Sequence, residues 1–269
     1  MQRKLARSGA MSRRKSAGFT LVELAVVLAV IGLIIGAMAI GKDVQRNAEY
    51  TKVKNKFIDQ WEQAYNQYYL RTGVVVGDSQ TRPQLMVNGA AFVIAGGVSG
   101  GDMSGTTPPG RLCDKADGRG MTARAAGAVA INLRTLMSQT GIRMPPGRAE
   151  GFEDRYVYLD SNGNPQEIQV CFQWNNPSSA EGSGNAMIIS GLTPDLARML
   201  DQMVDGKPDA QEGRFRLQGV ANGVANAPGV QWNRTNDDSI GGGAGAAGNN
   251  TRLDEDQVAT VVAIYKMNQ

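Results

Sequence analysis

A single carboxylate, Glu23, stands at the start of an apolar run that continues without charge from Ala25 to Gly41. A charged side chain at that depth in a bilayer costs about 3 kcal/mol unless a partner neutralises it. Just before it, the Gly18-Phe19 junction joins a small residue to a bulky one. These residues indicate two kinds of chemistry, which are cleavage of the chain by a peptidase and pairing of Glu23 with a cation.

The segment before Phe19 carries basic charge only. Residues 1–18 contain six Lys and Arg side chains and no acid, and such a flank is retained on the cytoplasmic side of a membrane. A secretory signal peptide is cut after its apolar run, whereas here the small-residue junction precedes the run. Cleavage there would leave the helix on the mature protein. Residues 19–41 would form about 34 Å of helix, enough to span a bilayer core.

The run Gly18-Phe19-Thr20-Leu21-Val22-Glu23 resembles the prepilin signature of type IV pilins and type II secretion pseudopilins. The resemblance covers residues 18 to about 71. It implies that a prepilin peptidase cuts after Gly18 and methylates the new amine of Phe19. It also implies that Glu23 pairs with the terminal amine of a neighbouring subunit during assembly. Many pilins have a proline in this helix, and none occurs between Phe19 and Thr81.

Two alternatives concern the start of the chain. A plain signal anchor would also show basic residues before an apolar helix, but it would need neither Glu23 nor the Gly-Phe-Thr-Leu order. Initiation at Met11 in place of Met1 would give a shorter basic leader, closer to those common in the family. The sequence leaves both starts open.

Composition excludes several classes of function. The chain has a net charge of +3, and removal of residues 1–18 changes it to −3, so no large cationic surface remains for a nucleic acid. The sequence contains no histidine, which excludes nucleophile–histidine pairs and histidine-bearing metal sites. It has no G-x-x-x-x-G-K-[ST] phosphate loop. We therefore predict a protein that is not an enzyme, carries no cofactor and binds no nucleic acid.

Three further groups of residues are candidates for specific roles. Cys113 and Cys171 are the two cysteines, and outside the inner membrane they would favour a disulfide, worth about 4 kcal/mol in the chain-entropy model. Two reduced thiols are the alternative. Gly32 and Gly36 form a G-x-x-x-G pair that lets membrane helices approach closely. The acids at 201, 205 and 209 raise the question of calcium, but their spacing favours a turn, and no metal site is predicted.

Helical periodicity continues beyond the membrane span. Apolar residues recur at helical spacing between 42 and 72 and include Phe57, Trp61 and Tyr65, which we expect to contact the core of the following domain. No glycine or proline interrupts before Gly73, where this helix should end. Further helices are predicted over 121–139 and from Pro194 to about residue 204, the latter with Thr193 as its N-cap.

Strands are predicted mainly in the second half of the chain. The pattern indicates a hairpin of 155–160 and 166–174 around Asn162-Gly163, with Ile168, Val170 and Phe172 on one face. Further strands are expected at 91–95, 186–190, 214–217 and 258–266. Residues 73–120 should otherwise be irregular, and 241–250 form a low-complexity loop.

These elements predict an α+β fold, a long N-terminal helix followed by an antiparallel sheet domain. The expected organisation is a removed leader (1–18), a transmembrane helix (19–41), an amphipathic extension (42–72) and a periplasmic or extracellular domain (73–269).

The resulting functional prediction is a prepilin-like structural subunit of a type IV pilus or type II secretion pseudopilus, in a minor or tip position. Its partners would be other pilin subunits, the prepilin peptidase and the inner-membrane assembly platform. It would lie in the inner membrane before assembly and in the filament afterwards. The alternative is a membrane-anchored periplasmic binding or adhesive domain that does not polymerise.

Overall fold

The computed structural model describes residues 19–92, 101–112, 132–220, 229–232, 237–240 and 252–267, with the backbone alone in 237–240 and 252–258. The chain divides into two compact units, Met1–Gln45 and Arg46–Gln269. The predicted leader, including Gly18, and the predicted 241–250 loop lie outside the described residues.

The first unit contains most of helix α1 (Leu21–Val53). Its apolar side chains are exposed along the whole span, from Leu21 at 87% to Val44 at 63%. In the described part of the chain, one helix is long and apolar enough to cross a membrane. The exposed apolar surface is the kind that lipid or neighbouring helices cover.

In the second unit, the helix continues through a π-helical turn, η1 (Lys54–Ile58), into α2 (Asp59–Thr72). The predicted amphipathic helix is confirmed, and it ends where expected because Gly73 adopts the left-handed conformation, with φ of 74°. The π turn was not predicted. It widens one turn so that Phe57 and Ile58 are both buried.

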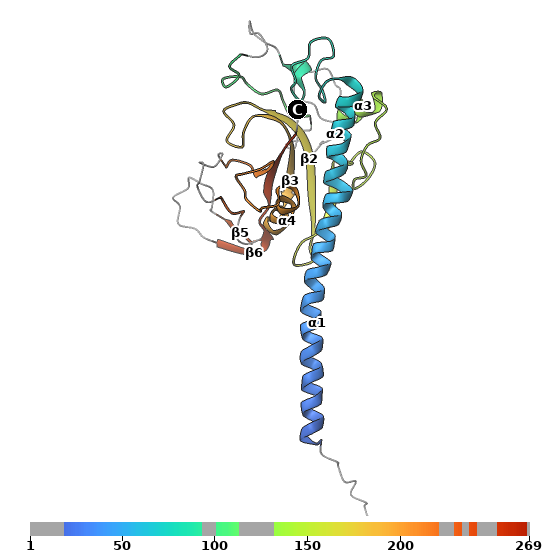
Figure 1. Ribbon diagram of the computed structural model, residues 1–269, viewed down its shortest axis with the longest axis vertical. Coiled ribbons are helices and arrows are strands. Elements are labelled where there is room, and N and C mark those ends of the chain that lie inside the picture. Colours follow the sequence, from blue (N-terminus) through green and yellow to red (C-terminus); the bar gives the residue numbers. More distant parts are fainter. Residues whose placement is uncertain are drawn as a thin grey trace, which may run out of the picture. The chain divides into compact units, whose positions relative to one another are not determined.

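A five-stranded antiparallel sheet forms the centre of the second unit, in the order β1-β2-β3-β7-β4. Its strands β2 and β3 are labelled in Figure 1. The α+β prediction is confirmed, as are four of the predicted strands within a few residues. The strands are β1 (Arg155–Leu159), β2 (Pro165–Asn175), β3 (Gly184–Leu192), β4 (Phe215–Leu217) and β7 (Val261–Lys266).

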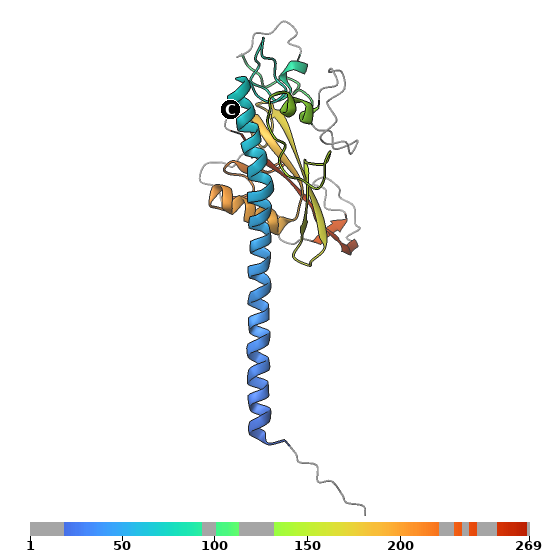
Figure 2. The ribbon, with the colours of Figure 1, turned by 90° about the vertical axis from the view of Figure 1, so that its right-hand side faces the viewer.

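The main core lies between one face of this sheet and the two helices α2 and α4 (Pro194–Asp205). Figure 2 shows α2 crossing in front of the sheet. The ring of Phe172 lies 6.0 Å from that of Trp61 and 5.1 Å from that of Tyr65. The helix stripe is therefore core packing, as predicted. On the opposite face, Ile188 and Ile264 form a smaller buried cluster with Ala186.

The predicted helix 121–139 is confirmed over 133–139 but not at Asn132, and the predicted strand 91–95 is wrong at residues 91 and 92. Within the predicted helix 121–139, the described helix is α3 (Leu133–Gln139), because Asn132 is extended and its side chain accepts a hydrogen bond from the N–H of Thr135. Asn132 therefore begins a helix, and 121–131 lie outside the described residues. The strand predicted at 91–95 conflicts with the 3-10 turn η2 (Gly89–Ala91).

The C-terminal strand is also corrected. The predicted strand 258–266 divides at residues 259–260 into β6 (Arg252–Val258) and β7, and β6 pairs with the unpredicted β5 (Asp237–Ile240) in a separate two-stranded sheet. Helix α4 begins at Pro194 as predicted. The side chain of Thr193, however, makes no capping bond to the helix. It lies 3.4 Å from the hydroxyl of Tyr158 instead.

Candidate processing and assembly site

The candidate site is built by the residues at which α1 begins. Thr20 directly precedes the helix, and its carbonyl accepts the first helical bond, from the N–H of Leu24 at 3.2 Å. The hydroxyl oxygen of Thr20 accepts a bond from the N–H of Glu23 at 3.3 Å. The Oε2 atom of Glu23 accepts bonds from the N–H of Thr20 at 2.8 Å and from its hydroxyl at 3.0 Å. This reciprocal arrangement is a capping box.

The capping box gives Glu23 a partner that the sequence argument missed. The pattern Thr20-x-x-Glu23 is the known signature of such a box and could have been found. Its donors are neutral, and the positive end of the helix dipole adds a favourable field. Glu23 is thus held at a fixed place at the helix start, while its negative charge has no formal cation among these partners.

The other predicted residues of the site are placed as follows. Phe19 precedes the helix and is 82% exposed, and Gly18 lies outside the described residues. Cleavage between them would leave the amide of Thr20, and so the capping box, intact. Gly32 and Gly36 lie four residues apart, hence on the same side of α1. A side chain added at either would meet no atom within 4 Å.

Comparison with known families supports the motif. Residues 13–39 match the family model described as the prokaryotic N-terminal methylation motif. The chain carries the signature of type IV pilins and pseudopilins. No curated protein and no solved structure matches the chain. The pilin signature therefore covers the helix start and membrane span, and the second unit has to be interpreted from its own contacts.

Within the second unit, polar contacts at Tyr50 and at Glu62 fasten the long helix to α4 and to the end of the sheet formed by β4 and β7. The Tyr50 hydroxyl donates to Oδ2 of Asp195 at 2.5 Å, and burial raises the pKa of Tyr50 above its ordinary value. Glu62 accepts bonds from Arg214 and from the Tyr265 hydroxyl, both at 2.9 Å. Burial likewise raises the pKa of Tyr265. These contacts fix the rotation of the helix about its axis.

The acids considered for calcium make a different structure. The Oδ2 atom of Asp201 accepts bonds from the indole N–H of Trp232 at 2.8 Å and from the N–H of Asp209 at 2.6 Å. Asp205 accepts bonds from the N–H groups of Arg214 and Phe215. Among the described residues, no group of three or more acidic or sulfur side chains is arranged to hold a metal ion. The acids hold together the loop after α4, which agrees with the turn that was expected.

Burial dominates the protonation of Asp201. Its side chain is fully buried, which raises the pKa of its carboxyl to about 7, and the nearby Asp205 adds to the rise. The bonds from Trp232 and Asp209 act in the opposite direction and are weaker in total.

Cys171 lies in β2 and is half-buried beside Gln169 and Ile188. It is on the face of the sheet that carries the smaller buried cluster. Cys113 lies outside the described residues. The residue before it, Leu112, donates its N–H to the carbonyl of Phe172 at 3.0 Å. The chain thus runs next to Cys171 immediately before residue 113.

Proposed function

We propose that this protein is a filament subunit of a type IV pilus or type II secretion pseudopilus, in a minor or tip position. A prepilin peptidase would cut between Gly18 and Phe19 and methylate Phe19. The mature helix would then pack against other subunits, with Gly32 and Gly36 at close contacts. Before assembly, the second unit would lie in the periplasm, attached to the inner membrane and recognised by the assembly platform.

One observation carries the proposal. A methylation motif matched at residues 13–39 coincides with a helix that begins at Leu21, just after the predicted cut, and places Glu23 in its first turn. An apolar helix leaving lipid has to find other apolar helices, and a carboxylate among them requires a cation. The amine of an adjacent subunit's Phe19 would supply that charge.

The decisive measurement is the N-terminal residue and mass of the protein purified from membranes. We expect a chain that begins at Phe19 and carries one additional methyl group. Replacement of Gly18 by Leu should block cleavage while leaving membrane insertion unchanged. A chain that keeps its leader in the unmodified protein would contradict the proposal.

The role of Glu23 in assembly can be separated from its role in the capping box. Glu23→Gln keeps an oxygen that can accept the bonds from Thr20 but removes the charge. Thr20→Val keeps the charge but removes the hydroxyl. We expect normal insertion and cleavage in both variants, and loss of filament incorporation in Glu23→Gln alone. Normal incorporation of Glu23→Gln would show that charge pairing is not needed.

We also propose that Cys113 and Cys171 form a disulfide in the exported protein. The hydrogen bond between Leu112 and Phe172 supports this pairing because it places the two chain segments side by side. Alkylation of the exported protein without reductant should then leave both cysteines unlabelled. Two labelled thiols would contradict the pairing.

A further inference from the structure

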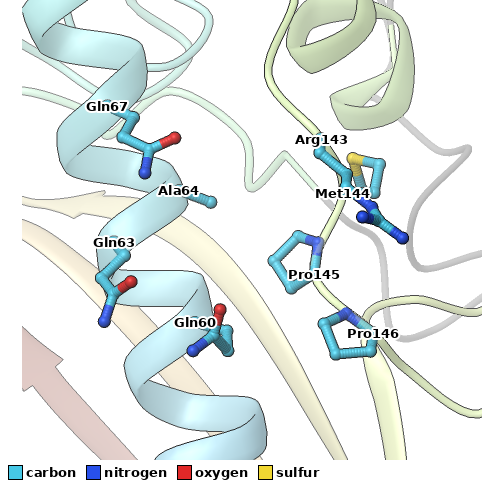
Figure 3. A pocket seen from close by; sticks show the side chains of 8 residues that line it. All are labelled: Gln60, Gln63, Ala64, Gln67, Arg143, Met144, Pro145 and Pro146. Carbon is cyan, nitrogen blue, oxygen red and sulfur yellow. The ribbon is translucent and has the colours of Figure 1, made fainter.

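A polar groove of about 440 Å³ lies on the second unit, and neither the pilin signature nor the proposed function uses it. One wall is a face of α2, with Gln60, Gln63 and Gln67. The other is the segment Arg143–Pro146 (Figure 3). Its volume lies within the range of ligand sites, about 300 to 1,000 Å³.

The groove is held open by contacts outside it. The guanidinium of Arg71, at the end of α2, donates to the carbonyls of Thr140 and Gly141 at 2.9 and 2.8 Å. These bonds fix the start of the second wall against the helix. Pro145 and Pro146 restrict the backbone further, and they hold the residues that precede them in extended conformation. A ligand would therefore meet walls that are already ordered, which lowers the cost of binding.

The lining offers hydrogen bonds of both kinds. Each glutamine presents a donor and an acceptor, and among the described residues a partner is found for Gln60 alone, the carbonyl of Asn55 at 3.4 Å. The backbone of Arg143–Pro146 makes no backbone hydrogen bond with the described residues either. Arg143 is exposed and is the one charged residue among the described residues that line the groove.

This chemistry selects among ligand classes. A helix docked in a groove needs a row of apolar pockets. Among the described lining residues, the apolar ones are Ala64, Met144 and the two prolines. Single-stranded nucleic acids need aromatic platforms and several cations, and the described lining has one cation and no aromatic ring. An extended peptide fits, since its backbone amides pair with side-chain amides.

The length of the groove along α2 also agrees with an extended peptide. Gln60 and Gln67 are separated by about 10 Å along the helix axis. About three residues of extended peptide cover the same distance. The single guanidinium adds a preference for a carboxylate.

We propose that the groove between α2 and Arg143–Pro146 binds an extended, acidic peptide segment of a partner protein. The three glutamines hydrogen-bond its backbone, and Arg143 pairs with one of its carboxylates. The site is independent of processing and of Glu23, so it can be tested whether or not filament assembly is confirmed.

The test uses the full chain in detergent micelles and a fluorescently labelled, blocked octapeptide of alternating Glu and Thr. Anisotropy titrations compare it with a Lys-Thr octapeptide and with a Glu-Thr octapeptide whose backbone nitrogens are methylated. We expect binding of the Glu-Thr peptide alone. Arg143→Glu should weaken it about tenfold or more, the scale of one lost charge-assisted bond.

Matched variants separate the groove from general surface effects. Gln63→Ala with Gln67→Ala should also weaken binding, whereas Arg82→Gln, at an exposed arginine of another loop, should not. All substituted side chains are exposed, so unchanged melting temperatures are expected and are checked. The proposal is overturned if the Glu-Thr peptide does not bind at millimolar concentration. It is also overturned if the three peptides bind equally or if Arg143→Glu leaves binding unchanged.

Discussion

The buried carboxyl of Asp201 makes the stability of the second unit depend on pH in a predictable direction. Its pKa is raised from 3.8 to about 7 in the folded chain, and burial is the largest cause. The unfolded chain therefore releases this proton near pH 4, whereas the folded chain keeps it until about pH 7. Between these values the folded state binds more protons, so the free energy of unfolding falls as the pH rises.

The size of the effect follows from the shift. At 1.36 kcal/mol per pKa unit, a change from 3.8 to about 7 corresponds to about 4 kcal/mol, which is an upper bound. This loss of unfolding free energy should be complete above about pH 7 and absent below about pH 4. Asp201→Asn removes the titration. Its amide oxygen can still accept the bonds from Trp232 and Asp209, and its NH₂ group can face Asp205 as a donor.

The assay is denaturant unfolding of the full chain in detergent at pH 4.5, 6 and 8, followed by tryptophan fluorescence. Asp201→Asn should gain stability relative to the unmodified protein as the pH rises, by several kcal/mol between pH 4.5 and 8. Asp102→Asn, at an exposed acid that bonds to Ser104, is the matched control and should stay parallel to the unmodified protein. A constant difference between Asp201→Asn and the unmodified protein across this range would refute the reasoning.

Three further predictions concern stability. Trp61→Ala should lower the unfolding free energy by about 3 to 5 kcal/mol because the side chain is fully buried. Leu70→Ala, at an exposed position on the same helix, is the control and should change the unfolding free energy by less than about 0.5 kcal/mol. Gly191→Ala should lower the melting temperature strongly, since φ is 81° and the added carbon would collide with the carbonyl of Glu167; a melting temperature equal to that of the unmodified protein would contradict that geometry. Cys171→Ser should lower the unfolding free energy of the oxidised protein by about 4 kcal/mol and leave that of the reduced protein nearly unchanged.

The fold was predicted well where the pattern is local. The α2 stripe, the β1–β2 hairpin and the Pro194 helix start each follow from the periodicity or turn chemistry of a few adjacent residues. The helix predicted over 121–139 is confirmed over 133–139, but Asn132 is not helical. Apolar spacing continued across that residue, but its side chain accepts a hydrogen bond from the N–H of Thr135 and so caps the start of α3.

The π turn at Lys54–Ile58 shows a different limit. An ion pair between Lys54 and Asp59, with nitrogen and oxygen 2.8 Å apart, spans five residues and suits the wider turn. Two adjacent apolar residues, Phe57 and Ile58, were the available hint. Whether the helix accommodates them by widening depends on the sheet against which they pack, and that sheet is formed by residues more than 90 positions away.

The sequence by itself was enough to predict a membrane-spanning helix and a site of processing. Charge, apolar length and the Gly18–Glu23 order act along one continuous segment, because a bilayer responds to contiguous composition. The tertiary structure alone decided the pKa of Asp201, the fastening of the helix through Glu62 and the groove beside Gln63. Each of these depends on burial or on partners that folding brings together from distant parts of the chain, and no local pattern specifies them.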